Sequence, residues 1–133
     1  MIALDTNLLV RLATDDVPAE RRAVVSLLER HETLIPKTVL LETEWVLRSR
    51  YGYAPGQIAE FFEYLSALAS MTFEDEEAVR WAVSAIRRGI DFADALHLAS
   101  AGGLPLATLD QALHRKVSRM KDARVQLVKV SGT

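Results

Sequence analysis

Residues 1–12 read MIALDTNLLVRL, an apolar run that three consecutive polar residues, Asp5, Thr6 and Asn7, interrupt. The pattern predicts a short buried strand over residues 2–4, followed by a helix that begins near the polar residues. In open α/β folds, ligands bind where strands end and the chain turns into a helix. Asp5 is therefore the first candidate for a residue with a chemical role.

Similar apolar runs predict further strands at residues 34–35, 71–73, 104–107 and 125–130. Between them, apolar residues recur at the three- and four-residue spacing of amphipathic helices, for example over residues 58–68. Pro18, Pro36 and Pro55 each lie near the start of such a helix, where a missing backbone N–H is harmless. The alternation predicts an α/β fold with three layers, α/β/α, around a central, mostly parallel five-stranded sheet.

The composition is that of a compact soluble domain. The 133 residues suit one domain over residues 1–133, and half of them are hydrophobic. The absence of cysteine excludes disulfides, thiolate metal sites and cysteine nucleophiles, and is compatible with the reducing cytoplasm. We expect no signal peptide and no membrane span, because the start lacks basic residues and the apolar stretches are short.

Four acidic residues are predicted to meet at one edge of this sheet. Asp5 and Asp110 follow the first and fourth predicted strands, and the usual reversal of strand order would make them neighbours. Glu42 lies in the second turn of a helix that begins near Thr38. Asp94 lies in the first turn of a helix that starts near Asp91 and reaches the fourth strand through a short link. All four side chains are therefore expected at the carboxyl edge.

Carboxylates gathered in this way repel one another. Two at ~4 Å cost on the order of 4 kcal/mol at an effective dielectric near 20. A shared proton or a divalent cation would offset this repulsion. Oxygen-only ligands favour a hard ion, Mg²⁺ or Mn²⁺, which lowers the pKa of bound water and stabilises charge on a phosphodiester. The predicted chemistry is hydrolysis of a phosphate ester.

Four segments resemble the acidic motifs of PIN-domain ribonucleases: DTNLL at 5–9, VLLETEWVL at 39–47, DFADAL at 91–96 and TLD at 108–110. Their order and spacing resemble most the VapC-type toxins of toxin-antitoxin pairs. The resemblance implies that Asp5, Glu42, Asp94 and Asp110 are the catalytic and metal-binding acids, supported by Asn7 and Thr108. It further implies a Mg²⁺- or Mn²⁺-dependent endoribonuclease that acts on RNA, forms a homodimer and is covered by a cognate antitoxin.

Each acid also has a purely structural interpretation. Asp5 and Asp110 are good N-caps for the helices that follow them, a role compatible with metal binding, and Asp91 is expected to be a cap. Glu42 lies on a helix that is apolar on most sides, where an unpaired buried Glu would be costly. Glu44 is the alternative inward-facing acid on that helix. Two further residues in apolar helical patterns, Trp45 and Trp81, are expected in the core.

Basic residues after Asp110 form a strip that could hold phosphates, although solvated charges are common: His114, Arg115, Lys116, Arg119, Lys121 and Arg124. Arg11 could reach an antitoxin or RNA, or face solvent. Among rival functions, an aspartyl phosphatase needs an acid where Asn7 stands, and a receiver-like switch lacks its acidic pair. A catalytically silent magnesium-binding interaction module on the same fold is the alternative that stays open.

Overall fold

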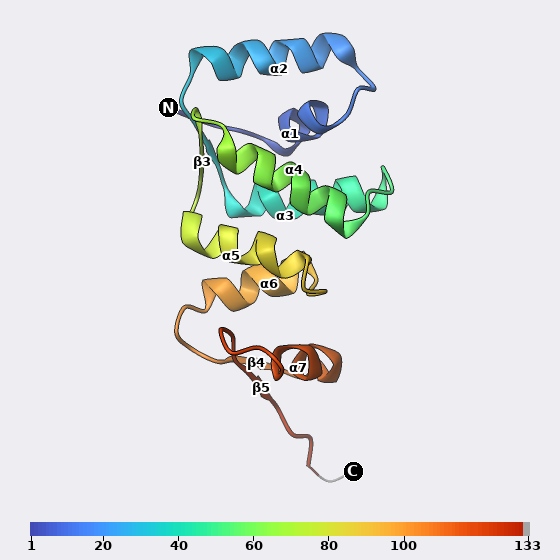
Figure 1. Cartoon of the computed structure of the whole chain (residues 1–133), viewed down its shortest axis with the longest axis vertical. Coiled ribbons are helices and arrows are strands. Elements are labelled where there is room, and N and C mark those ends of the chain that lie inside the picture. The colour runs from blue at the N-terminus through green and yellow to red at the C-terminus, as the bar shows by residue number, and fades with distance from the viewer. Residues whose placement is uncertain (132–133) are drawn as a thin grey trace.

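The computed structural model describes residues 1–131 as seven helices and five short strands (Figure 1). In chain order these are β1 (Ile2–Ala3), α1 (Thr6–Ala13), α2 (Pro18–Arg30), β2 (Thr33–Ile35), α3 (Lys37–Ser49), α4 (Pro55–Ala67), β3 (Met71–Phe73), α5 (Glu76–Ile86), α6 (Phe92–Ser100), β4 (Leu106–Thr108), α7 (Gln111–Val117) and β5 (Val125–Leu127). The predicted α/β fold class is confirmed. The fourth strand begins two residues later and ends one residue later than predicted, directly before Leu109-Asp110.

All of the strand pairs are parallel, but the strands form two hydrogen-bonded groups rather than one sheet. β2 lies between β1 and β3, while β4 pairs with β5 alone. The predicted neighbourhood of β1 and β4 is therefore not present in this structure. A physical reason is the length of β1, whose two exposed residues offer few backbone groups to a further strand.

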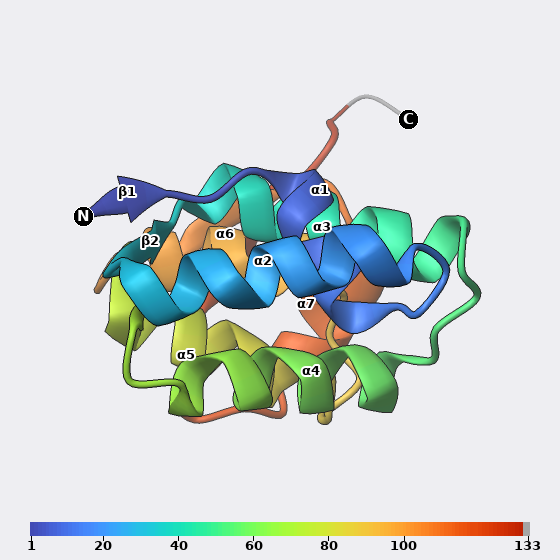
Figure 2. The ribbon, with the colours of Figure 1, turned by 90° about the horizontal axis from the view of Figure 1, so that it is seen from above.

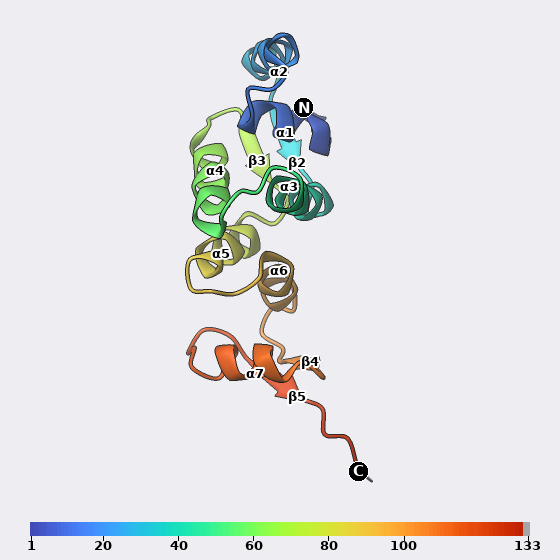
Figure 3. The ribbon, with the colours of Figure 1, turned by 90° about the vertical axis from the view of Figure 1, so that its right-hand side faces the viewer.

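The helices are stacked along the long axis of the molecule (Figures 1 and 3). α2 and α1 lie near one end, α3 to α6 form the middle, and α7 with β4 and β5 lies toward the other end. Seen from above, α2 crosses the face of the stack and α4 and α5 run along one side (Figure 2). One hydrophobic cluster runs through these layers, from Leu9 on α1 through Phe62 on α4 to Val117 on α7.

Local sequence explains where several helices begin. Pro18 and Pro55 occupy the first position of α2 and α4, as predicted, whereas Pro36 is one residue earlier, as the N-cap of α3. The first turn of α4 is closed further by the Gln57 side chain, which accepts a hydrogen bond from the Ala54 N–H at 2.8 Å. These local signals therefore set the first residues of α2, α3 and α4.

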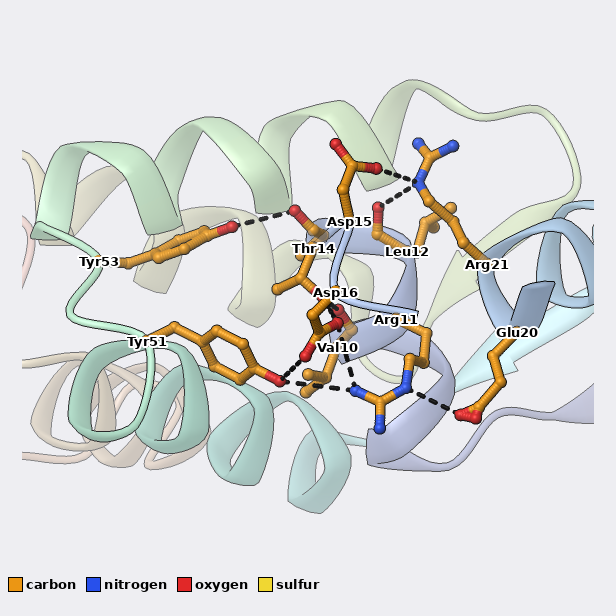
Figure 4. Close-up of polar contacts among 11 residues, drawn as sticks. Val10, Arg11, Leu12, Thr14, Asp15, Asp16, Glu20, Arg21, Tyr51 and Tyr53 are labelled. Atoms are coloured by element: carbon orange, nitrogen blue, oxygen red, sulfur yellow. Dashed lines mark hydrogen bonds and ion pairs between the residues drawn. The ribbon is translucent and has the colours of Figure 1, made fainter. Parts of the chain in front are cut away.

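Polar contacts fasten the loop after α1 to the loop after α3 (Figure 4). Arg11 Nε donates to Glu20 at 2.9 Å, and its Nη1 lies 3.6 Å from Asp16. The Tyr51 hydroxyl donates to Asp16 at 2.7 Å, and the Tyr53 hydroxyl donates to a carbonyl of α1 at 3.0 Å. Arg11 is therefore engaged within the chain and is not the freely solvated residue that the sequence left possible.

A second polar clamp joins α5 to the loop that precedes β5. Asp122 Oδ2 accepts hydrogen bonds from Trp81 Nε1 at 2.9 Å and from Arg88 Nη1 at 3.0 Å. Arg88, and then Trp81, lower the pKa of the Asp122 carboxyl from its ordinary value of 3.8 to about 2. Trp81 is thus only half-buried, with its indole N–H used at the surface, rather than a core residue as predicted.

This clamp predicts a pH-dependent contribution to stability. The folded pKa lies below the unfolded one, so the stabilisation is present above pH 4 and is lost as the pH falls toward 2. Because the carboxylate is 46% exposed, we expect about 1 kcal/mol rather than the full value of the shift. Urea unfolding of the wild type and Asp122→Asn checks this: the two curves should differ at pH 6 and converge near pH 2. An equal difference at both pH values would contradict it.

Candidate functional site

The structure brings Asp94 and Asp110 together at the starts of two helices. After α6 ends, the chain turns at Gly102, which has a positive φ of 65°. It then passes through β4 to the start of α7. Asp94 lies in the first turn of α6 and Asp110 is the N-cap of α7. The pKa of Asp94 is raised by burial first, then by the charges of Asp91 and Asp110. These carboxylates are therefore near enough to repel one another, although the repulsion was predicted for all four acids of the quartet.

Hydrogen bonds to the backbone fix the positions of these acids. Asp91 caps α6 by accepting from the Asp94 N–H at 3.3 Å, which confirms its predicted capping role. Asp110 accepts from the Leu113 N–H at 3.0 Å through one oxygen, Oδ1. The Thr108 hydroxyl accepts from the Asp110 N–H at 3.1 Å, so Thr108 holds the backbone of the acid that it was predicted to support. Capping uses only part of each carboxylate.

Asp5 lies elsewhere in the stack. It is exposed and caps α1, with Oδ1 accepting from the Thr6 N–H at 2.7 Å. α1 and α7 are at different levels of the molecule, with α3 and α6 between them (Figure 3). The Thr6 hydroxyl, beside Asp5, is buried and has no hydrogen-bond partner; within residues 1–131 it is the one side-chain polar atom of this kind. The structure thus does not place Asp5 beside Asp110, because β1 and β4 do not pair.

The two acids of α3 take opposite faces of the helix. Leu40, Thr43, Glu44 and Leu47 are its buried residues. Glu42 lies on the exposed face together with Trp45, whose exposed fraction is 50%. The expectations that Glu42 is buried and that Trp45 belongs to the core are therefore wrong in this structure. The reason is helical periodicity. Glu42 lies two positions from the buried Leu40 and Glu44, and Trp45 lies two positions from the buried Thr43 and Leu47, so both point away from the core.

Glu44 is the inward-facing acid, and it holds an arginine. Its carboxylate accepts two hydrogen bonds from Arg48, from Nε at 2.8 Å and from Nη2 at 3.3 Å. These bonds raise the pKa of Arg48, and the charge of Asp91 contributes in the same direction. Sequence reasoning missed Arg48, although the Glu44–Arg48 spacing of four residues is the one at which oppositely charged side chains meet on a helix.

The basic strip after Asp110 is divided between two places. The charge of Lys116 offsets part of the rise in the pKa of Asp94, and Lys116 Nζ donates to the Gly89 carbonyl at 3.2 Å. Lys121 and Arg124 instead line a separate cavity of about 580 Å³ between α5, α6 and the loop before β5. Arg124 donates there to the Gly103 carbonyl at 2.5 Å. Of these three cations, only Lys116 therefore faces the acids.

The donor set suits a hard divalent cation. Mg²⁺ typically uses one or two carboxylates together with waters and substrate phosphates, and Asp94 and Asp110 offer such a pair. A cation would also offset the burial and the carboxylate repulsion that together raise the pKa of Asp94. Among residues 1–131, no three His, Asp or Glu side chains lie close enough together to form a ready-made metal cage. The pair fits the ion, while the quartet is not assembled here.

The chain thus combines an α/β/α fold with a pair of carboxylates at the starts of α6 and α7, an arrangement that suits a metal-dependent hydrolase. A comparison with known families matches residues 2–118 to the PIN domain. The chain therefore belongs to the PIN domain family, whose members are generally metal-dependent nucleases. A comparison with curated proteins gives no match. Over residues 1–131, the helices are all too short or too polar to cross a membrane.

Proposed function

We propose that this PIN domain is an endoribonuclease that depends on Mg²⁺ or Mn²⁺ and hydrolyses RNA phosphodiester bonds. The observation that carries the proposal is the convergence of Asp94 and Asp110 at the starts of α6 and α7, where burial and then the charges of Asp91 and Asp110 raise the pKa of Asp94. Family membership supports the same chemistry. Bound Mg²⁺ would supply coordinated water of lowered pKa and positive charge beside the phosphodiester. Asp94 and Asp110 hold the ion, and Thr108 fixes the backbone of Asp110.

Asp5 and Glu42 complete the acidic quartet in this proposal, and Asn7 supports Asp5. The basis is the match of their motifs to the family and the position of Asp5 at a strand end. Completing the quartet requires β4 to approach β1, since the two strands belong to separate hydrogen-bonded groups. Both acids are exposed and therefore accessible to an ion.

We also propose that the protein is the toxin of a cytoplasmic toxin-antitoxin pair and acts as a homodimer over one domain, residues 1–133. A groove of about 450 Å³ between α1 and α2 supports an antitoxin partner. It begins at Asn7, next to Asp5, and its other walls include Leu8, Val24 and Leu27. A peptide lying in this groove would pass beside Asp5 and hinder access to it.

The test is cleavage of a panel of structured RNAs by the purified protein in Mg²⁺, Mn²⁺ or EDTA. The proposal expects cleavage with either metal, none in EDTA, and recovery when excess Mg²⁺ is added back. Equal cleavage in EDTA would contradict metal dependence. Metal binding without cleavage of any RNA in the panel would favour the alternative, a catalytically silent magnesium-binding interaction module.

A further inference from the structure

A small hollow lies beside the acidic helix starts, and no role has yet been assigned to it. Its volume is about 240 Å³, and residues of α3, α4, α5, α6 and α7 line it. Its wall is largely apolar, formed by Pro55, Ile58, Ile86, Ile90 and Phe92. Asp91, which caps the helix that carries Asp94, lies on its rim. The hollow is thus adjacent to the proposed site of cleavage.

One side of the hollow presents an arginine that is held in place. Glu44 is only 7% exposed, and its two oxygens accept from Nε and Nη2 of Arg48. The Arg48 side chain itself is 46% exposed. In the described part of the chain, its remaining N–H groups have no partner, so they are available to a ligand. A guanidinium anchored along one edge loses little freedom when its other edge binds.

A lysine approaches the hollow from the other side. Lys116 lies on α7, less than two turns after the cap Asp110, and its Nζ donates to the Gly89 carbonyl at the rim. Its ammonium group retains two further donors. Arg48 and Lys116 are therefore the two cations around a hollow whose acidic neighbours would otherwise repel a polyanion. This distribution of charge suits a phosphate next to the acids rather than a neutral ligand.

We propose that Arg48, positioned by Glu44, and Lys116 bind the RNA phosphate that flanks the cleaved bond, with the base of that nucleotide in the apolar hollow. This subsite rests on the proposed ribonuclease function and specifies how its substrate is held. Arginine and lysine are the principal phosphate ligands in proteins, and arginine can present two parallel N–H groups. Pockets that enclose whole small molecules measure about 300–1,000 Å³, so this smaller hollow suits a single base.

The test measures RNA affinity separately from cleavage. Binding of a fluorescent single-stranded RNA is followed by anisotropy in EDTA, at several salt concentrations. Arg48→Gln and Lys116→Gln are each expected to weaken binding about tenfold and to lower the slope of log K against log salt by about 0.7. Arg80→Gln is the matched control, because Arg80 makes the same bond at 2.8 Å to Glu76 and does not line the hollow.

Glu44→Gln separates positioning from charge. It retains Arg48 and should therefore leave the salt slope unchanged, while the loss of the anchor weakens binding about threefold. Arg48→Lys also keeps the charge, so its salt slope should equal that of the wild type while its affinity falls. A merely structural role for the Glu44–Arg48 pair would leave the salt slope of Arg48→Gln equal to that of Arg80→Gln. Should Arg48→Gln fail to fold, the salt slope of Lys116→Gln decides.

The outcomes distinguish this subsite from the function on which it rests. RNA cleavage by the wild type, with Arg48→Gln and Lys116→Gln binding RNA as Arg80→Gln does, would overturn the subsite alone. A wild-type protein that neither binds nor cleaves any RNA would overturn both. Weaker binding and a lower salt slope in both hollow variants, but not in Arg80→Gln, is the result that the subsite requires.

Discussion

Asp94→Asn is expected to abolish metal-dependent RNA cleavage, with a loss of at least about 100-fold in rate. Asparagine preserves the shape of the side chain and removes the charge that attracts the cation. The fold should survive, because Asp94 is a repelled carboxylate whose pKa is raised by burial and by the charges of Asp91 and Asp110. The free energy of unfolding should therefore be unchanged or slightly higher. Cleavage rates and urea unfolding curves of the same preparations measure the two expectations together.

The matched control for this prediction is Asp122→Asn. It also replaces a carboxylate with an amide, but in the clamp between α5 and the loop before β5. We expect this variant to cleave RNA at the wild-type rate at neutral pH, despite its small loss of stability. Undiminished cleavage by Asp94→Asn would show that Asp94 is not part of the catalytic site, whatever the family resemblance implies.

Phe62→Ala is expected to cause the largest loss of stability, on the order of 3–5 kcal/mol. Phe62 is fully buried, and its ring lies 5.2 Å from that of Phe92, between ring centroids. Truncation would leave a cavity where α4 contacts α6, which the surrounding helices fill only in part. A loss of this size is a large part of the about 5–15 kcal/mol that stabilises a typical domain. Urea unfolding measures it directly.

The same substitution is predicted to affect the site as well as the core. Phe92 directly follows Asp91 and opens the helix that carries Asp94, so the Phe62–Phe92 contact helps to fix the start of that helix. Tyr64 lies on α4 like Phe62, but it is 49% exposed, so Tyr64→Ala is the control. It should lower the free energy of unfolding by less than about 1 kcal/mol. Equal losses in the two variants would show that the contact at Phe62 is not central to the core.

Much of the fold was predictable because its signals are local. The helical spacing over residues 58–68 and the prolines near helix starts each depend on neighbouring residues alone, and they match the observed elements. The apolar run before Asp5 predicted the strand β1, but its expected burial was wrong, because Ile2 and Ala3 are exposed. The pairing of strands is not local. Whether β4 joins β1 depends on the edges of strands that are two and three residues long, and so few residues carry little pairing information.

The candidate site was predictable to the same extent. Asp94 and Asp110 were expected together because a short link joins their elements, and the structure places them together. The choice between Glu42 and Glu44 turned on which face of α3 is buried. With apolar residues on most sides of that helix, the sequence pattern alone did not determine this face. Arg48 was missed because its role depends on its pairing with the buried Glu44.

We propose that Asp5, Glu42, Asp94 and Asp110 share one metal site, and Mn²⁺-induced broadening of the amide NMR signals is the direct test. The proposal predicts that the amides next to all four acids broaden together at the same low Mn²⁺ concentration, and that Asp94→Asn abolishes the effect at all four. Broadening around Asp94 and Asp110 that leaves the amides next to Asp5 and Glu42 sharp would contradict the shared site, and the metal would then belong to the Asp94–Asp110 pair alone.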